Sequence, residues 1–196
     1  MFTLYLMPGA SSMAPHIALH EIGAPFEIRS LSFARGEQRA PAYLAINPEG
    51  KVPTLTAPGL MLTEVAAILF YLARRFPEAE LMPDALEAQA RIISWMSFTA
   101  ATLHPSFMAG PERTLAALEQ AERRLDGRAW AVGERMSIAD IHLFRLFWRM
   151  RHTHDLPLDS LPGLMAHYDR MMARPAVQRT CAAEQALGYE LRGLRL

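Results

Sequence analysis

Residues 46–73 read INPEGKVPTLTAPGLMLTEVAAILFYLA, and this stretch decides the fold. Two short β-prone runs, KVPTLTA and LMLT, are separated by Pro58-Gly59, a combination that predicts a β-hairpin. Pro53 stands within the first run, although proline in a strand is usually confined to edges and bulges. Glu64 then precedes an apolar run with helical periodicity, so the hairpin is predicted to lead directly into a helix.

The residues before this stretch predict a βαβ unit. A β-prone run over 2–7 stops at a Pro-Gly turn, and a helical pattern then runs from Met13 to a glycine C-cap at Gly23. A second strand is predicted within PFEIRSLSF, residues 25–33. Because a crossover helix joins them, the two strands should be parallel.

The residues after this stretch predict helices alone. The proline-rich, acidic segment 77–84 is interpreted as a linker. Helical patterns then cover 86–108, 112–126, 138–153 and 161–174, with a shorter one after Pro175. Strands first and helices afterwards predict an α/β plus all-α protein, with a βαβ-ββα domain at 1–76 and an all-helical bundle domain at 85–196.

Composition excludes several classes of protein. Of the 196 residues 51% are hydrophobic, which allows a sizeable core, and 20 basic side chains balance 20 acidic ones. The broad positive charge of a nucleic-acid binder is therefore missing, and we expect no nucleic-acid partner. Cys181 is the only cysteine, which favours a reducing, cytoplasmic location without disulfides. No signal peptide is recognised, and the longest apolar run, 65–73, is too short to span a membrane.

The clearest helix start is MSIADIHLF, residues 136–144. Ser137 suits the N-cap, and Asp140 stands at the third helical position, so each can accept a backbone N–H that the helix leaves unpaired. We interpret this pair as a determinant of folding and not as catalytic.

Four motifs in order carry a resemblance to a known family. YLMPGASSMAPHIALHEIG, AINPEGKVPTL, LTEVAAILFYLA and GERMSIADI together resemble the cytosolic glutathione transferase superfamily, and the first three are most similar to its bacterial beta-type members. The resemblance covers essentially the whole chain. It implies a thioredoxin-like N-terminal domain, an all-helical C-terminal domain, a cytoplasmic homodimer and a role in detoxification, with glutathione as co-substrate.

The resemblance assigns roles to the stretch that opens this section. The bond matching Val52-Pro53 is cis in the family, and the backbone of Val52 would pair with the cysteinyl part of glutathione like an added strand. Glu64 matches the acid that binds the α-amino group of the γ-glutamyl residue, beside a helix N-terminus that takes the carboxylate. Val65 departs from the family, which usually has Ser there, so a hydroxyl for that carboxylate is lost.

The chain also departs from the family at the reactive thiol. Beta-type members have a cysteine in PGACS, whereas this chain reads PGASS and has Ser11 at that position, followed by Ser12. A serine hydroxyl cannot exchange disulfides, but it can donate a hydrogen bond to the glutathione sulfur, as in serine-type members. Alternatively, Ser11 and Ser12 do no more than cap the helix that begins at Met13.

Other candidates follow from the resemblance alone. His104 matches a histidine that lines the active site from the helical domain, although a lone histidine in an apolar helix is more often a core residue than a catalytic one. Arg35 and Lys51 are candidates for the glycine carboxylate of glutathione, with Gln38 and Arg39 in the same mobile stretch. The electrophile would lie between the domains, near candidates such as Met13, Phe107, Met108 and Phe147.

No metal site is expected. His16 and His20 are spaced to share a helix face, and His152 and His154 are close in sequence, but neither pair has a third ligand.

Three functions remain open. The main one is a glutathione transferase that promotes thiolate attack on small, apolar electrophiles. The second is a glutathione-dependent isomerase, whose SSCSW-type motif this chain replaces with SSMAP. The third is a catalytically silent binding or regulatory protein, favoured by Val65 and the missing cysteine. No membrane partner is expected for any of them.

Overall fold

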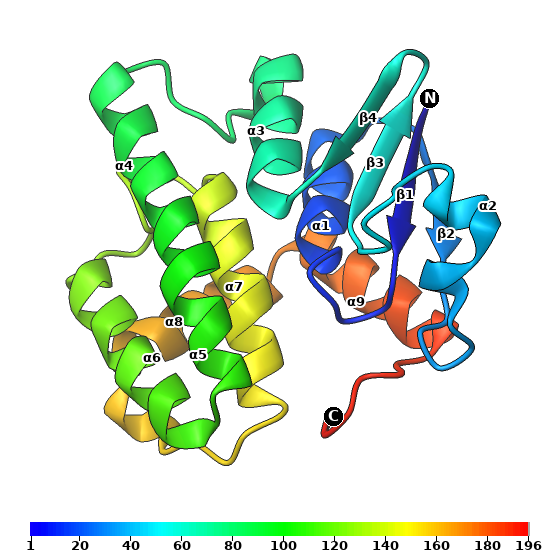
Figure 1. The fold of residues 1–196 in the computed structure, drawn as a ribbon. Helices are drawn as coiled ribbons and strands as arrows, with labels where there is room; N and C mark the ends of the chain where they lie inside the picture. The colour runs from blue at the N-terminus through cyan, green and yellow to red at the C-terminus, as the bar shows by residue number, and fades with distance from the viewer. Residues whose placement is uncertain (196) are drawn as a thin grey trace. The chain divides into compact units, whose positions relative to one another are not determined.

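The computed structural model describes residues 1–195 and forms two compact units (Figure 1). The first unit comprises residues 1–78 together with 175–192, and the second comprises 79–174 with the described residues that follow Arg192. The sequence placed the last helix in the all-helical domain, whereas in the structure that helix packs against the first helix of the chain. The domain limits 1–76, 77–84 and 85–196 themselves stay a prediction.

A four-stranded sheet forms the centre of the first unit, in the order β2-β1-β3-β4. Its strands are β1 (Phe2–Leu6), β2 (Phe26–Ser30), β3 (Thr54–Ala57) and β4 (Leu60–Thr63). β1 pairs in parallel with β2 and antiparallel with β3, and β3 pairs antiparallel with β4. The predicted βαβ unit and hairpin are therefore confirmed, and with them the predicted fold class.

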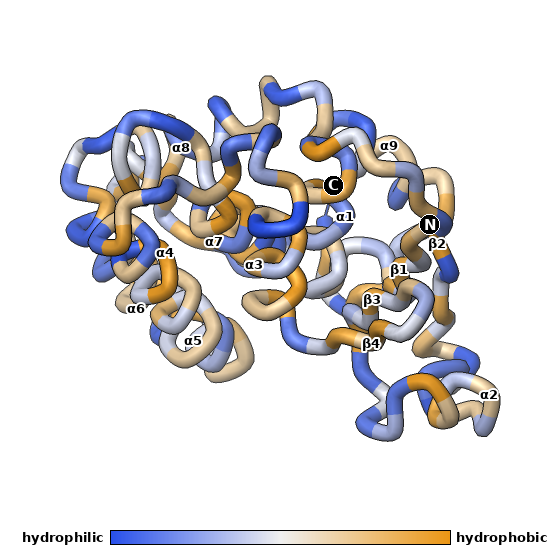
Figure 2. The backbone as a smooth tube through the Cα atoms, turned by 90° about the horizontal axis from the view of Figure 1, so that it is seen from above, coloured by the Kyte–Doolittle hydropathy of each residue, from blue (hydrophilic) through white to orange (hydrophobic). Residues whose placement is uncertain are grey.

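Helix α1 (Met13–Ile22) packs against two other helices of the first unit and against the sheet. It contacts α3 (Val65–Arg75), α9 (Pro175–Leu187) and β1. α1 ends where predicted, because Gly23 adopts the left-handed conformation that a C-cap requires, with φ 66°. Figure 2 shows hydrophobic stretches along the strands, and the core between sheet and helices contains fully buried side chains such as Leu4, Leu6, Ile17, Leu55 and Leu69.

The stretch before β3 is more ordered than the sequence indicated. It forms a short 3₁₀ turn, η1 (Glu37–Arg39), and the single-turn helix α2 (Pro41–Leu44). Pro41 at the first helical position suits a helix start. Tyr43 is only 4% exposed, and its burial holds the turn against the rest of the unit. Four residues are too few for a periodic pattern, which is why this helix was missed.

The second unit is helical, as predicted. Its helices are α4 (Leu86–Phe98), α5 (His104–Met108), α6 (Pro111–Leu125), α7 (Ile138–Arg151) and α8 (Pro162–Met172), with a short turn η4 (Leu158–Ser160). Another short turn, η2 (Pro77–Ala79), spans the boundary between the two units in the sequence. The predicted helix over 86–108 is present, but a π-helical turn, η3 (Thr99–Leu103), joins α4 to α5. Among residues 1–195, no helix is long and apolar enough to cross a membrane.

The start of α7 is fixed by Asp140. Its carboxylate is fully buried and accepts the Ser137 N–H at 2.8 Å and the Ala131 N–H at 2.7 Å, while His167 Nε2 lies 3.0 Å away. Ser137 accepts in return from the first turn of the helix, which confirms the predicted capping box. The same carboxylate thus ties α7 to the preceding loop and to α8.

We predict that Asp140→Ala lowers the free energy of unfolding by about 3–5 kcal/mol, because it leaves buried donors unpaired in three segments. Urea unfolding followed by circular dichroism measures the loss. Ser137→Ala, which removes one cap, should cost only about 1 kcal/mol. Equal losses in the two variants would show that Asp140 is no more than a cap.

Candidate functional site

The loop between β1 and α1 holds its two serines in different environments. The Ser12 side chain is fully buried, and its hydroxyl accepts the Met7 N–H at 3.2 Å and donates to the Met7 carbonyl at 3.1 Å. Ser11 is partly exposed, and no residue in 1–195 hydrogen-bonds its hydroxyl. Ser12 makes no side-chain cap to α1. The structure thus uses Ser12 to close the loop and leaves the hydroxyl of Ser11 available.

Glu184, a residue of α9, binds the backbone of this loop. Its Oε2 accepts the Gly9 N–H at 2.6 Å, and its Oε1 lies 2.8 Å from His16 Nδ1 on α1. Both side chains of the Glu184–His16 pair are 0% exposed. Sequence analysis missed Glu184, because nothing in the sequence links a carboxylate near the C-terminus to a turn near the N-terminus.

The chain's single cysteine does not offer a reactive thiol. Burial, assisted by the charge of Glu184, raises the pKa of Cys181 to about 11. The thiol therefore stays protonated at neutral pH, where it is a poor nucleophile.

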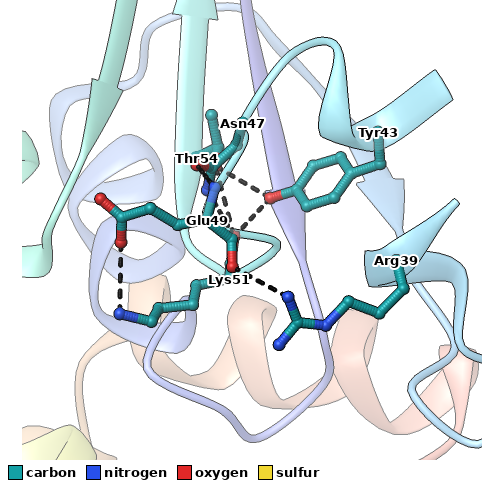
Figure 3. A network of polar contacts seen from close by, with 6 residues as sticks. All are labelled: Arg39, Tyr43, Asn47, Glu49, Lys51 and Thr54. Carbon is teal, nitrogen blue, oxygen red and sulfur yellow. Dashed lines mark hydrogen bonds and ion pairs between the residues drawn. The ribbon is translucent and has the colours of Figure 1, made fainter. Parts of the chain in front are cut away.

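The segment before β3 presents an ordered backbone edge. The Val52-Pro53 bond is cis, as the resemblance implied. Figure 3 shows hydrogen bonds to the residues that precede and follow this dipeptide in the sequence: Asn47 Nδ2 donates to the Lys51 carbonyl at 2.9 Å, and the Tyr43 hydroxyl lies 2.9 Å from Thr54 Oγ1. Within the described chain, the backbone N–H and C=O of Val52 have no backbone partner. This peptide edge is available to an extended ligand.

Glu64 adopts an unusual conformation at the start of α3. It has φ 64° and ψ 125°, outside the regions that residues with a Cβ normally occupy, and its side chain is exposed. The Glu64 carbonyl accepts the Ile68 N–H at 3.0 Å, which leaves the N–H groups of the first helical turn without intrahelical partners. Val65 is 8% exposed. Because its side chain is apolar, it can offer a ligand only its backbone N–H and no hydroxyl.

The two basic candidates are engaged in exposed local ion pairs. Arg35 pairs with Glu37 at 2.9 Å, and Lys51 pairs with Glu49 at 3.2 Å; the basic side chains are 72% and 71% exposed. Exposed ion pairs contribute little to stability, so either cation can exchange its partner for a ligand carboxylate. The structure does not bring them together with Ser11 by any contact.

His104 belongs to the second unit, where it begins α5 and is partly exposed. Burial, and then the charge of Arg145, lower the pKa of His104, so the ring is neutral at neutral pH. Of the proposed electrophile contacts, Met13 and Phe147 are buried at 0% and 1% exposed, whereas Met108 is 76% exposed.

A hollow of about 520 Å³ lies elsewhere in the first unit, against β1, β2 and the segment with η1 and α2. Tyr5, Ile28 and Tyr43 are among its walls, and none of the predicted site residues lines it. Its position argues against it as the site predicted from sequence.

Comparison with known families agrees with this geometry. Residues 1–74 match the model of the glutathione S-transferase N-terminal domain, and residues 65–175 match that of the C-terminal domain. The chain belongs to the glutathione S-transferase family. The first match covers the Ser11 loop, the Val52 edge and the start of α3, and the second covers the part of the helical unit that contains His104.

Bacterial glutathione S-transferases are similar over nearly their whole length. Glutathione S-transferase GstA of Escherichia coli O157:H7 is 34% identical over 92% of this chain and 98% of its own. A glutathione transferase homolog from Sulfitobacter, solved with bound glutathione, has a TM-score of 0.86 and 30% identity over 96% of this chain and 98% of its own. The beta-class enzyme of Sphingomonas chungbukensis has a TM-score of 0.82 and 35% identity over 93% and 98%.

We predict that Glu64→Gly raises the free energy of unfolding by about 1 kcal/mol. Glycine adopts this positive φ without strain, which stabilises the folded state. Its more flexible unfolded chain offsets part of this stabilisation. Urea unfolding of this glutathione S-transferase without ligand measures the change. Glu64→Ala is the matched control, since it removes the same carboxylate but keeps a Cβ and the strain. Equal stability of the two variants would show that the backbone here is unstrained.

Proposed function

We propose that this protein is a glutathione transferase of the serine type, in which the Ser11 hydroxyl stabilises the glutathione thiolate for attack on a small, apolar electrophile. One observation carries the proposal: Ser11, just before α1, is partly exposed and its hydroxyl has no hydrogen-bond partner among residues 1–195, while the neighbouring Ser12 is buried and bonded to Met7. Membership in the family and the similarity to a homolog solved with bound glutathione support it.

The proposed reaction requires a modest lowering of the pKa of the glutathione thiol. A free thiol with a pKa of about 8.5 is mostly protonated at neutral pH, and the thiolate is the nucleophile. Each unit of pKa depression needs about 1.4 kcal/mol of preferential thiolate stabilisation. A hydrogen bond from Ser11 together with the N-terminus of α1 supplies about one to two units. The thiol proton leaves to solvent, and the thiolate then forms a carbon–sulfur bond with the electrophile while the bond to a leaving group such as chloride breaks and that group departs with the electron pair.

The rest of glutathione is assigned to groups mostly of the first unit. The peptide edge of Val52 pairs with the cysteinyl backbone. Glu64 binds the ammonium of the γ-glutamyl residue, and the N–H groups at the start of α3 bind its carboxylate. Arg35 and Lys51 are the proposed cations for the glycine carboxylate. His104, from the second unit, is proposed as a neutral hydrogen-bonding group in the active site.

We also propose a homodimer, acting in detoxification in the cytoplasm. Both units carry exposed hydrophobic side chains that a second copy would cover. In the first unit Met61 on β4 is 47% exposed and Phe70 on α3 is 42% exposed; in the second, Ile93 on α4 is 44% exposed.

We predict that Ser11→Ala lowers kcat/KM about tenfold at pH 6.5, because it raises the thiol pKa by about one unit, and that the loss shrinks at higher pH. Turnover of a chloronitrobenzene with glutathione, measured against pH, tests this. Ser12→Ala is the control and should lower the stability of the fold while the pH profile stays in place. A pH-independent loss in Ser11→Ala, or wild-type protein that binds glutathione without turnover, would contradict the proposal.

We predict that Val65→Ser tightens glutathione binding about 10- to 100-fold, because it adds a hydroxyl donor for the γ-glutamyl carboxylate where the chain now has an apolar side chain. Isothermal titration calorimetry measures the dissociation constant. Val65→Ala, which shortens the side chain without adding a donor, is the control. If both variants bind equally, the carboxylate does not lie at this helix start.

A further inference from the structure

The second unit contains four basic side chains on or next to α7, and the proposed glutathione chemistry uses only one of them, His104. His142, Arg145 and Arg149 are spaced three and four residues apart along α7 and so share a helix face. α7 packs against α4 and against the π-helical turn η3, which leads into His104 (Figure 1). We call His104, His142, Arg145 and Arg149 the basic cluster.

The centre of the basic cluster is buried and unsatisfied. Arg145 and His142 are each 3% exposed. In the part of the chain that the structure describes, Arg145 Nε and both ring nitrogens of His142 are buried without a hydrogen-bond partner. Thr99, at the first position of η3, is fully buried and its hydroxyl is equally unpaired. Buried polar groups are normally paired, so a group of unpaired ones needs a reason.

The charges that act on the two buried members of the basic cluster, His142 and Arg145, are themselves basic. Burial, and then the charges of Arg145 and His104, lower the pKa of His142 well below its usual value. Burial, and then Arg149, lower the pKa of Arg145 to about 10. Among the described residues, no carboxylate is one of the charges that shift these two pKa values, and Arg145 still carries its charge at neutral pH. An uncompensated buried cation is strongly unfavourable, whereas an anion beside it removes most of that cost.

We propose that the basic cluster binds the carboxylate of a small apolar acid. The unpaired Nε–H lies on the edge of the guanidinium that, with a neighbouring Nη–H, presents two parallel donors matched to the two oxygens of a carboxylate. Neutral His142 and the Thr99 hydroxyl are further donors. The single fully buried cation matches a single negative charge. The Phe107 ring, with the Arg149 guanidinium 5.4 Å from its centroid, offers apolar surface to the remainder of the acid.

Two sources would supply this chemistry: a free monocarboxylic acid, or an electrophilic co-substrate that carries a carboxylate. The second rests on the proposed function. The first does not, because it requires binding alone.

Thermal unfolding with sodium benzoate tests binding, with sodium chloride at equal ionic strength as reference. Wild-type protein should show a saturable rise in Tm, about 5 °C or more at a hundred times the dissociation constant. Arg145→Met should fold and show no rise, while Arg123→Met, which removes an exposed arginine of α6, should respond like wild type. No saturable rise in wild type at millimolar benzoate, or the same rise in Arg145→Met, would overturn the proposal.

A second variant at the same position keeps the test valid if Arg145→Met fails to fold. Arg145→Lys keeps the charge but loses the paired donors, so benzoate should bind at least about tenfold more weakly. Unchanged affinity in Arg145→Lys would overturn the bidentate carboxylate geometry.

Turnover distinguishes the two sources. 4-Chloro-3-nitrobenzoate and its methyl ester both lose chloride as the glutathione sulfur bonds to the ring, and they differ only in the carboxylate. If the acid is the co-substrate, Arg145→Met should raise its KM about tenfold and leave that of the ester unchanged. A benzoate-dependent rise in Tm without any effect on these KM values assigns the site to a free acid. If neither compound turns over, the proposed function fails while the Tm response still decides the carboxylate site.

Discussion

The buried carboxylate of Glu184 is the constraint on which the candidate site depends. It joins three segments of the first unit, because it accepts the N–H of Gly9 in the β1–α1 loop, pairs with His16 on α1 and is itself part of α9. A buried carboxylate that lost either partner would be strongly destabilised, so the three segments are held in one arrangement. The loop that carries Ser11 is therefore positioned by the last helix of the chain.

The candidate site consists mainly of polar groups that take no part in holding the fold together. Ser12, one residue from Ser11, is used entirely to close the loop on Met7. The Lys51 carbonyl is taken by Asn47, while the next peptide edge, that of Val52, has no backbone partner among the described residues. Glu64 holds a conformation unfavourable for a residue with a Cβ, directly before helical N–H groups that have no backbone acceptor in residues 1–195. Unpaired donors, an exposed carboxylate and local strain in one unit are typical of a binding site and not of a purely structural surface.

Sequence patterns predicted the long elements well and the isolated side chains poorly. The βαβ unit, the hairpin, the Gly23 cap and the Ser137–Asp140 capping box could be predicted because each rests on neighbouring residues. The resemblance supplied the cis bond at Val52-Pro53, which local pattern alone does not determine. α2 was missed because it is a single turn, and Glu184 because its partners lie about 170 residues away. The unpaired Arg145 resembles any helical arginine until the packing around α7 is known.

The account's central claim is that the Ser11 hydroxyl lowers the pKa of the glutathione thiol. Its most direct test is the ultraviolet absorption of the thiolate of bound glutathione, titrated against pH in wild-type protein and in Ser11→Ala. The account predicts a midpoint one to two units below the free thiol's pKa of about 8.5 in wild type, moving back toward that value in the variant. A wild-type midpoint equal to that of free glutathione, or an identical shift in both proteins, would contradict it.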